Sequence, residues 1–579
     1  MFSYRPLESN AMFRLATLPS TADIESNGKI EVEVRHYELA KMKNKYIALS
    51  YVWGSPERVH SISINGSDFW VTENLMYALR RPRDRRLRFW IDAICINQDN
   101  LNEKSIQVPM MREIYEYAAA VYVELGPASL AEERVFAQFK QMAESVLSEI
   151  KRLECEKDSE SILAQMIIPQ VEGYDHDFWE TIGEIFNRPW WSRVWIMQEA
   201  TATEMTQLFL GTTTTKLVYL RGIDIAIQVL KVRKGWRDGV PPTTRRRSIL
   251  RILSISQLRH QEHILLLDVI EQFRQLGASD PRDIVYAALC LANDIPPGAI
   301  VPDYQKSLTE VYREVAIYYL TTLDHPLDFL GYCGTRFQVL DFPKESASWI
   351  PQWNWIYPRA IFPKSFYCNG SKFRSFNACG QAQKLSQWGF TGINVVNLTL
   401  STLGFRVDII TEVKDPSLFV NAVDGAKCIQ DWQPSDPSLP YVTGGTRMNA
   451  FLSTLVGDIG GMSKGDSTNS RRGGLADWDY SQGRLAVGPD QQSLHISSCY
   501  PQMRRLAWTE NLYMGLVSHQ AQIGDFIYVL FGGSMLYVLR PKEDDFLLVG
   551  ECYVHGLMDG KAMDLLKEDN SLVHKVRIV

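Results

Sequence analysis

A short apolar run near the N-terminus ends in side chains that could contact a ligand. The run Tyr46–Val52 carries Ser50 and Tyr51 and leads directly into Trp53 and Gly54. A nearly continuous apolar run of this length is typical of a buried parallel strand. In open α/β sheets, ligands bind beyond the carboxyl ends of such strands. The hydroxyl and aromatic groups at this strand end are therefore candidates for contacts with a small molecule.

The segment Trp90–Asn100, WIDAICINQDN, shows a similar arrangement. We expect a second buried strand over Arg88–Ile96 that contains Asp92, followed by a polar loop with Asn97 and Gln98. Binding pockets are mostly apolar and hold a few polar groups that fix the orientation of the ligand. One carboxylate and two amides at a strand end could supply such groups.

A third segment, Arg188–Ala200, is rich in tryptophan and contains a single acid. If its sequence RPWWSRVWIMQEA is helical after the proline, Trp191, Trp195 and either Gln198 or Glu199 lie along one face. Trp191 at such a position is expected to pack in the core. The acid has two interpretations, either a functional carboxylate or a partner in a salt bridge.

Standard catalytic and metal-binding signatures are absent from the sequence. It contains no GxxxxGK[ST] loop, no GxGxxG after a strand, no HExxH and no GxSxG. His260 and His263 are three positions apart without a third ligand nearby, so we expect no metal site. The basic cluster Arg80–Arg88 contains an aspartate and precedes a buried strand, which favours a solvated turn over a phosphate site. We expect no bound cofactor.

The elements predicted around these segments form a βαβ unit. A hairpin is expected at Asn65-Gly66, between the first two buried strands. The second strand leads into a helix over Glu103–Ala120, with Pro109 in its first turn, and then into a strand over Ala119–Leu125. Two strands joined through a helix in this way imply a parallel sheet.

The pattern of the chain changes along its length and divides it into four parts. We expect a lead-in over residues 1–40, an α/β domain over 41–215, a helical region over 216–345 and a β-rich region over 346–579. Helical spacing in the third part covers Leu250–Leu276, Arg282–Ala292 and Leu308–Leu323. The clearest strands of the last part are Phe526–Phe531, Met535–Arg540 and Phe546–Val554, with a turn at Gly532-Gly533.

Composition restricts the class of protein. The 579 residues include 61 Lys and Arg against 67 Asp and Glu, and this slight acidic excess argues against nucleic-acid binding. The nine cysteines are scattered and include no CxxC pair, which is typical of reduced thiols inside the cell. No apolar run is long enough for a membrane span, and the N-terminus lacks a signal-peptide core. We expect a soluble cytoplasmic protein.

The three segments together resemble the blocks of the fungal heterokaryon incompatibility (HET) domain. LSYVWG, WIDAICINQ with IYEYAAAVYVELG, and RPWWSRVWIMQE occur in that order. Stretches at Asp280–Ala292, Val301–Tyr312 and Gly524–Gly560 also resemble such proteins, so the resemblance extends over nearly the whole chain. It implies a role in fungal non-self recognition, in which incompatible fusion triggers programmed cell death. It also implies an unidentified incompatibility partner and a homo-oligomer.

HET domains are regarded as distant relatives of TIR domains, so the resemblance further implies a flavodoxin-like sheet and an activity. Many TIR domains hydrolyse NAD with one glutamate in a W-x-x-x-E pattern, which Trp195 and Glu199 match. By this resemblance Glu199 is the catalytic carboxylate, which stabilises the positive charge that develops on the ribose of the substrate NAD. The implied substrate-binding residues are Ser50, Tyr51, Trp53, Gly54, Asp92, Asn97, Gln98 and Trp195.

The main alternative is a non-catalytic signalling module. In it the HET domain self-associates or binds a partner, and Glu199 pairs with Arg193 or Arg188. A third alternative gives the HET fold a structural role and assigns recognition to the β-rich part. TIR-like domains act both as enzymes and as binding modules, so the fold does not decide between them. A catalytic Glu199 is expected in a cleft lined by Ser50–Gly54 and Asn97–Asn100, and a structural one at the surface beneath an arginine.

Overall fold

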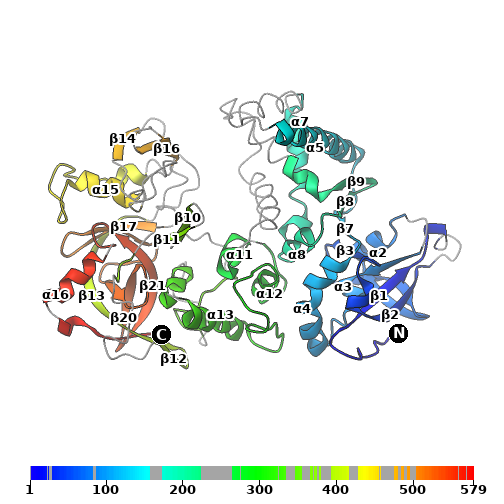
Figure 1. Ribbon diagram of the computed structural model, residues 1–579, viewed down its shortest axis with the longest axis horizontal. Coiled ribbons are helices and arrows are strands. Elements are labelled where there is room, and N and C mark those ends of the chain that lie inside the picture. The colour runs from blue at the N-terminus through cyan, green and yellow to red at the C-terminus, as the bar shows by residue number, and fades with distance from the viewer. Residues whose placement is uncertain are drawn as a thin grey trace. The chain divides into compact units, whose positions relative to one another are not determined.

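The computed structural model forms two compact units, Met1–Ser307 and Leu308–Val579, each described here by itself (Figure 1). The division falls inside the predicted helical region 216–345, and the boundaries of the four predicted parts stay predictions. The structure describes residues 2–22, 24, 29–82, 86–156, 173–222, 264–273, 276–323, 325–333, 346–354, 365–368, 371–374, 377–379, 393–415, 428–455, 457, 475–479, 484–487, 492–495, 504–558, 560–568 and 570–579.

The N-terminal unit is built on a mixed sheet in the order β5-β4-β2-β1-β6-β3-β7-β8-β9. Its strands are β1 (Met12–Leu18), β2 (Glu31–Glu38), β3 (Ile47–Tyr51), β4 (Arg58–Ile64), β5 (Ser67–Thr72), β6 (Leu87–Trp90), β7 (Ala120–Glu124), β8 (Thr206–Leu210) and β9 (Thr213–Lys216). The four strands β6-β3-β7-β8 are mutually parallel, as predicted for the βαβ unit. Antiparallel pairs flank this block, so the sheet is mixed and not wholly parallel.

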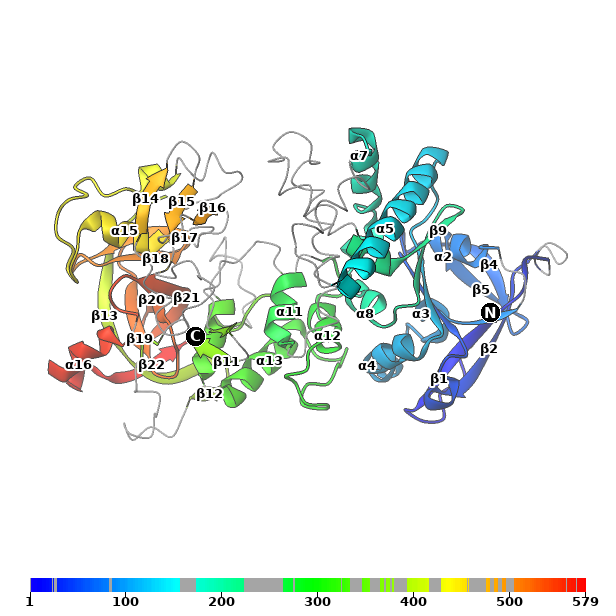
Figure 2. The same ribbon diagram turned by 45° about the horizontal axis from the view of Figure 1, so that its top comes forward.

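The described helices of this unit surround the sheet or follow it in the chain. They are α2 (Glu73–Leu79), α3 (Asp92–Cys95), α4 (Leu101–Tyr117), α5 (Leu130–Glu156), α7 (His176–Ile185), α8 (Ile196–Thr201), α11 (Leu266–Phe273) and α12 (Asp283–Leu289), with 3-10 turns η1 (Leu39–Met42), η2 (Pro189–Ser192) and η3 (Leu217–Tyr219). Figures 1 and 2 show α8 beside α12, and α8 contacts both α4 and α12. These contacts bring a segment after residue 276 against the HET-like blocks.

Three local predictions in this unit are wrong. Asp92 is not in a strand but begins the one-turn helix α3, because a short apolar run does not distinguish strand from helix. Pro109 lies well inside α4 and not in its first turn. An interior proline costs about 3 kcal/mol, but α4 buries Val108, Met111 and Ile114, and each such side chain contributes about 1.5–3 kcal/mol. Tertiary packing therefore outweighs the local penalty.

The tryptophan-rich segment is also not one helix. The 3-10 turn η2 ends at Arg193, whose extended backbone (φ −83°, ψ 140°) separates it from α8. Trp191 packs against Phe186 in the core, with ring centroids 5.0 Å apart. Trp195 stands directly before α8 and Glu199 within it, and the Glu199 amide donates to the Trp195 carbonyl at 3.3 Å. Trp195 and Glu199 are therefore one helical turn apart, as predicted. Trp191 does not share their helix face, because it belongs to η2.

The later helices agree with the predicted periodicity where the structure describes them. α12 lies within the predicted Arg282–Ala292 helix, and α13 (Leu308–Thr322) matches the predicted Leu308–Leu323. Of the predicted helix Leu250–Leu276, the structure describes α11 and its flanks; residues 250–263 and 274–275 lie outside the described part, with His260 and His263 among them. Among the helices that the structure describes, none is long and apolar enough to cross a membrane.

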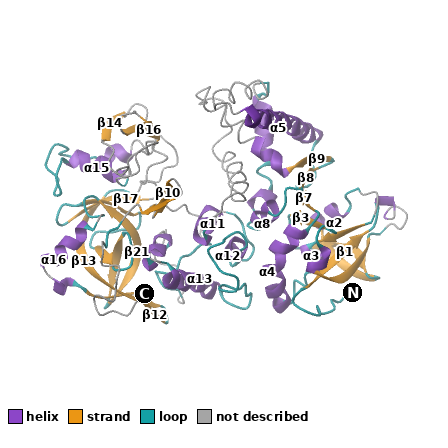
Figure 3. Ribbon diagram, viewed as in Figure 1, coloured by secondary structure: helices purple, strands orange, loops and turns teal. Residues whose placement is uncertain are grey.

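The C-terminal unit is dominated by strands, as predicted (Figure 3). These are β10 (Ser365–Cys368), β11 (Ser371–Arg374), β12 (Asn394–Val396), β13 (Thr399–Val413), β14 (Leu475–Asp479), β15 (Arg484–Val487), β16 (Gln492–His495), β17 (Arg504–Thr509), β18 (Met514–Ser518), β19 (Phe526–Leu530), β20 (Leu536–Lys542), β21 (Asp545–Val554) and β22 (His574–Ile578). Its remaining elements are α13, η4 (Pro326–Tyr332), α15 (Arg447–Leu455), η7 (Lys561–Asp564), α16 (Leu565–Glu568) and η8 (Asn570–Leu572).

Six of these strands close into a barrel. The long strand β13 pairs with β17 through its C-terminal half and with β19 along its middle, so the order β13-β17-β18-β21-β20-β19 returns to its start. Within the described residues, closure gives each of these six strands a neighbouring strand on both sides. The predicted hairpin between β19 and β20 is confirmed. Gly532 adopts φ +101°, and a Cβ on Gly533 would lie 2.4 Å from the Tyr537 hydroxyl, so both turn positions favour glycine.

Candidate functional site

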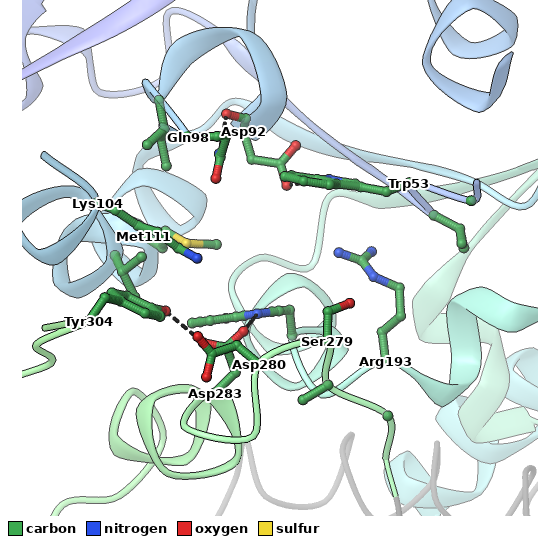
Figure 4. Close-up of a pocket in the computed structure, with 17 residues that line it drawn as sticks. Trp53, Asp92, Gln98, Lys104, Met111, Arg193, Ser279, Asp280, Asp283 and Tyr304 are labelled. Atoms are coloured by element: carbon green, nitrogen blue, oxygen red, sulfur yellow. Dashed lines mark hydrogen bonds between the residues drawn. The ribbon is translucent and has the colours of Figure 1, made fainter. Parts of the chain in front are cut away.

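The N-terminal unit contains a cavity of about 400 Å³ beyond the carboxyl ends of β3 and β6 (Figure 4). One wall is formed by the residues after β3, by α3 and by Arg193. The facing wall is formed by α4, by Trp195, by residues 277–280, by Asp283 and by Tyr304. The cavity therefore lies at the edge of the parallel block where the sequence predicts a binding site.

The structure brings five of the predicted site residues to this cavity. These five residues are Trp53, Gly54, Asp92, Gln98 and Trp195. Four others do not line it.

Of these four, Ser50 and Tyr51 belong to β3 and lie behind the wall, together with Glu199. Asn97 lines a second cavity of about 230 Å³, which it shares with Tyr4 and Glu103.

One end of the cavity combines an exposed ring with an acid. Trp53 is 40% exposed, and its indole Nε1 donates to Asp92 Oδ2 at 2.9 Å. The Ala93 amide donates to the other carboxylate oxygen at 2.7 Å, and Gln98 Nε2 donates to the Asp92 carbonyl at 3.0 Å. Burial raises the pKa of Asp92 to about 6. This acid can therefore change its charge close to neutral pH.

Glu199 lies in a layer of polar groups directly behind the cavity wall. Its side chain is 2% exposed and accepts hydrogen bonds from Ser50 Oγ at 2.6 Å and from the Tyr115 hydroxyl at 3.4 Å. Ser50 Oγ in turn accepts from Trp190 Nε1 at 2.6 Å. Burial raises the pKa of the Tyr115 phenol well above its usual value, so this hydroxyl stays a neutral donor.

Arg193 connects this layer to the cavity. Its guanidinium donates to the Tyr51 carbonyl at 2.7 Å and approaches both carboxylate oxygens of Glu199 at 3.5 Å. Burial disfavours its charge, but the carboxylates of Glu199 and Asp92 outweigh burial and raise the pKa of Arg193. Glu199 is thus neither in the cavity wall nor at the surface, and Arg193 stands between it and the cavity.

The other candidate partner of Glu199, Arg188, is engaged elsewhere. It pairs with Glu132 at 2.6 Å and donates to the carbonyls of Leu125 and Pro127. Of the two arginines considered from the sequence, Arg193 is the one that contacts Glu199. This contact keeps the non-catalytic interpretation of the acid open.

The facing wall holds residues that were not proposed from the sequence. Asp283, at the start of α12, accepts hydrogen bonds from Trp195 Nε1 at 3.1 Å and from the Tyr304 hydroxyl at 2.6 Å. Burial raises the pKa of Asp283 to about 6. Lys104 from α4 places its amino group 4.1 Å from the centroid of the Tyr304 ring. The sequence feature that could have indicated Asp283 is the polar run DPRD before an apolar helix. Because this run lies far along the chain from the other blocks, the sequence did not show that it belongs to the same site.

One further cluster could hold a metal ion by geometry. Among the described residues it consists of His176, Asp177 and Glu180 on α7. All three side chains are substantially exposed to solvent. They belong to a helix outside the cavity, and exposed acids often gather without a metal.

Comparisons with known proteins agree with the resemblance. The model of the family "Heterokaryon incompatibility protein (HET)" matches residues 46–199, and that of the "Het-6 beta-barrel domain" matches residues 488–573. The chain is 26% identical to "Heterokaryon incompatibility protein 6, OR allele" of Neurospora crassa, in an alignment that covers 91% of each chain. No solved structure matches the chain. The chain therefore carries a heterokaryon incompatibility (HET) domain over residues 46–199 and a Het-6 β-barrel domain over residues 488–573.

Proposed function

We propose that this protein acts in heterokaryon incompatibility and triggers cell death after fusion with an incompatible partner. The similar Neurospora crassa protein is named for heterokaryon incompatibility, and the alignment includes both matched domains. In this role the protein assembles with itself and responds to an incompatibility partner protein. The HET-domain cavity is its effector site.

We further propose that the effector reaction is hydrolysis of NAD in this cavity. The order β6-β3-β7-β8 in the parallel block corresponds to that of the first four strands of a flavodoxin-like sheet, 2-1-3-4, which supports the TIR-like comparison. The observation that carries the proposal is the arrangement at one end of the cavity. Trp53 and Asp92 line it, and Glu199 stands behind Arg193.

The chemistry of this reaction requires a carboxylate but no second acid. The bond between the nicotinamide nitrogen and ribose C1′ breaks, and its electron pair neutralises the pyridinium as nicotinamide leaves. The ribose carbon becomes oxocarbenium-like, and water then adds to it and loses a proton. Negative charge close to the ribose stabilises this transition state. We assign this role to Asp92 and Glu199, the acids at the Trp53 end of the cavity.

Glu199 reaches the ribose only if Arg193 moves. The 3.5 Å separations in this pair exceed the 2.7–2.9 Å that is typical of a strong charge-assisted hydrogen bond. The Arg193 bond to the Tyr51 carbonyl is much shorter, at 2.7 Å. In the proposed cycle the guanidinium moves away from Glu199 when the ligand binds and keeps its hydrogen bond to the Tyr51 carbonyl.

The experiment is induced expression of the full chain in a fungal host, with measurement of growth and intracellular NAD. The wild-type chain is expected to lower NAD before growth stops, and Glu199→Gln to abolish both effects. Glu124→Gln is the matched control. Like Glu199, Glu124 is a buried glutamate that pairs with an arginine, but it lies on β7, its partner is Arg81, and it does not line the cavity. Growth arrest without loss of NAD would contradict the proposed reaction.

A non-catalytic signalling module is the second candidate, and the enclosure of Glu199 favours it. The carboxylate already accepts hydrogen bonds from Ser50 and Tyr115 and pairs with Arg193, as expected of a structural acid. In that case Glu199→Gln would still arrest growth at an unchanged NAD level. Variants on a binding surface would then be needed to abolish the effect.

A further inference from the structure

Lys104 is a cation at the edge of the cavity, and its amino group makes no direct contact with an acid among the described residues. The amino group lies over the face of the Tyr304 ring, and its charge attracts the carboxylates of Asp280 and Asp283 from a greater distance. Figure 4 shows its amino group directed toward the space between the two walls. A cation held over a ring in this way stays available to a ligand.

The acids on the same side of the cavity are already satisfied by protein donors. Asp280 binds the Arg282 guanidinium through both oxygens, at 2.9 and 2.7 Å. Asp283 accepts from Trp195 and Tyr304. Because each carboxylate has its own donors, the amino group of Lys104 is the charge on this side that a ligand can neutralise.

The opposite side of the cavity presents an exposed aromatic ring beside an acid. Figure 4 places Trp53 and Arg193 across the cavity from Lys104 and Tyr304, with Asp92 next to the Trp53 ring. An exposed indole face beside a carboxylate suits a flat cationic ring. The adjacent guanidinium already has the Tyr51 carbonyl and Glu199 as acceptors. One side of the cavity thus holds Lys104 beside two acids that have their own donors, and the other side holds an exposed aromatic ring beside Asp92.

We propose that Lys104 binds the phosphate of a pyridine nucleotide whose cationic ring lies against Trp53 and Asp92. This assignment deepens the proposed NAD hydrolysis and rests on it for the identity of the ring. A phosphate and a pyridinium joined through one ribose carry opposite charges at opposite ends, which matches the two sides of the cavity. Lys104 then determines specificity by selecting phosphorylated ligands over their nucleosides.

The test is titration calorimetry on the full chain with two probes that differ by one phosphate. These are nicotinamide mononucleotide and nicotinamide riboside. A charge-assisted hydrogen bond predicts that the wild-type chain binds the mononucleotide about 10- to 100-fold more tightly. Lys104→Gln is expected to reduce this preference to about threefold or less and to leave the riboside affinity unchanged. Lys216→Gln, an exposed lysine on β9, is the matched control and should keep the full preference.

Three outcomes would overturn the assignment. Wild-type protein that binds both probes equally, or neither of them, has no phosphate site of this kind. A Lys104→Gln variant that loses affinity for the riboside as well would show that Lys104 supports the cavity wall and does not bind phosphate. Failure of the proposed hydrolysis is a separate result: phosphate-dependent binding without nicotinamide release would leave Lys104 assigned and exclude the reaction.

Discussion

Asp92 and Asp283 line the cavity as acids whose charged forms are disfavoured by burial, which raises the pKa of each to about 6. The usual pKa of an aspartate is about 3.9 in an unfolded chain. Between these values the folded state binds more protons than the unfolded state, so stability falls as the pH rises. The full loss in the free energy of unfolding is present above about pH 6. An acid kept at such a cost is characteristic of a functional site.

Asp92→Asn is therefore expected to stabilise the N-terminal unit at neutral pH while it weakens ligand binding. A pKa shift of about two units corresponds to at most about 3 kcal/mol, and loss of an oxygen that accepts from Trp53 or Ala93 reduces the gain. Urea unfolding should show the variant to be more stable than wild type at pH 7.5 and equal to it near pH 4. A variant that is less stable at both values would refute the raised pKa.

Ser50 is the residue on which the polar layer behind the cavity depends. Its hydroxyl donates to Glu199 and accepts from Trp190, both buried. Ser50→Ala leaves a buried carboxylate and a buried indole N–H short of one partner each, at about 1–3 kcal/mol apiece. We expect a loss of about 2–4 kcal/mol in the free energy of unfolding. Ser192→Ala, whose exposed hydroxyl bonds to the Pro189 carbonyl, should change it by less than about 0.5 kcal/mol.

Among the secondary structure elements, the segment before α12 completes the cavity although it lies outside the matched residues 46–199. The amide of Gly277 donates to the Ser192 carbonyl at 2.5 Å, and its carbonyl accepts from Val194 at 2.9 Å. Asp283 then links Trp195 to Tyr304. A chain that ended with the matched segment would lack this wall.

Asp283→Ala is expected to loosen that wall. The substitution removes the acceptor for Trp195 Nε1 and the Tyr304 hydroxyl, so hydrogen exchange should increase at residues 277–283 and 302–306. Asp283→Asn retains an acceptor and should show a smaller increase. Mass spectrometry of the exchanged full chain measures both variants. Unchanged exchange in Asp283→Ala would mean that the backbone hydrogen bonds between Gly277 and the Ser192–Val194 segment hold residues 277–283 in place without Asp283.

Local pattern predicted the elements of this unit better than it predicted their assembly. The apolar run at Tyr46–Val52 and the Asn65-Gly66 turn identified β3 and the β4–β5 hairpin because strand burial and turn geometry are local properties. The same reasoning failed at Asp92 and at Pro109, where tertiary packing decides the local conformation. It also offered two places for Glu199, a cleft or the surface, because spacing does not show that the acid is buried with Arg193 between it and the cavity.

The closed barrel and the second cavity wall could not be predicted from local sequence pattern, because both depend on contacts between residues far apart in the chain. Strands β19 to β21 were predicted individually, but barrel closure depends on pairing of β13 with both β17 and β19, which are about 100 residues later in the chain. The Lys104–Tyr304 contact joins residues that are 200 positions apart in the sequence. Contacts at such distances leave no periodicity in the sequence.

The chain as a whole divides into two units with separate cores, and this division has a thermodynamic consequence. Scanning calorimetry should resolve two unfolding transitions, each sensitive to substitutions in one unit. Asp283→Ala should lower only the transition of Met1–Ser307. Asp328→Ala, which removes the acceptor for the Ser534 amide and hydroxyl, should lower only that of Leu308–Val579. A single transition that both variants shift equally would show that the units unfold together.

Nicotinamide release from NAD by the purified full chain tests the account most directly. It is measured at concentrations high enough for self-association, beside Glu199→Gln and Glu124→Gln. We predict release by the wild-type chain and by Glu124→Gln, with a loss of at least about 100-fold in Glu199→Gln, the size expected when one group that stabilises transition-state charge is removed. Equal release by all three proteins would contradict the role of Glu199. No release by the folded wild-type chain would contradict NAD hydrolysis and leave the HET domain as a signalling module.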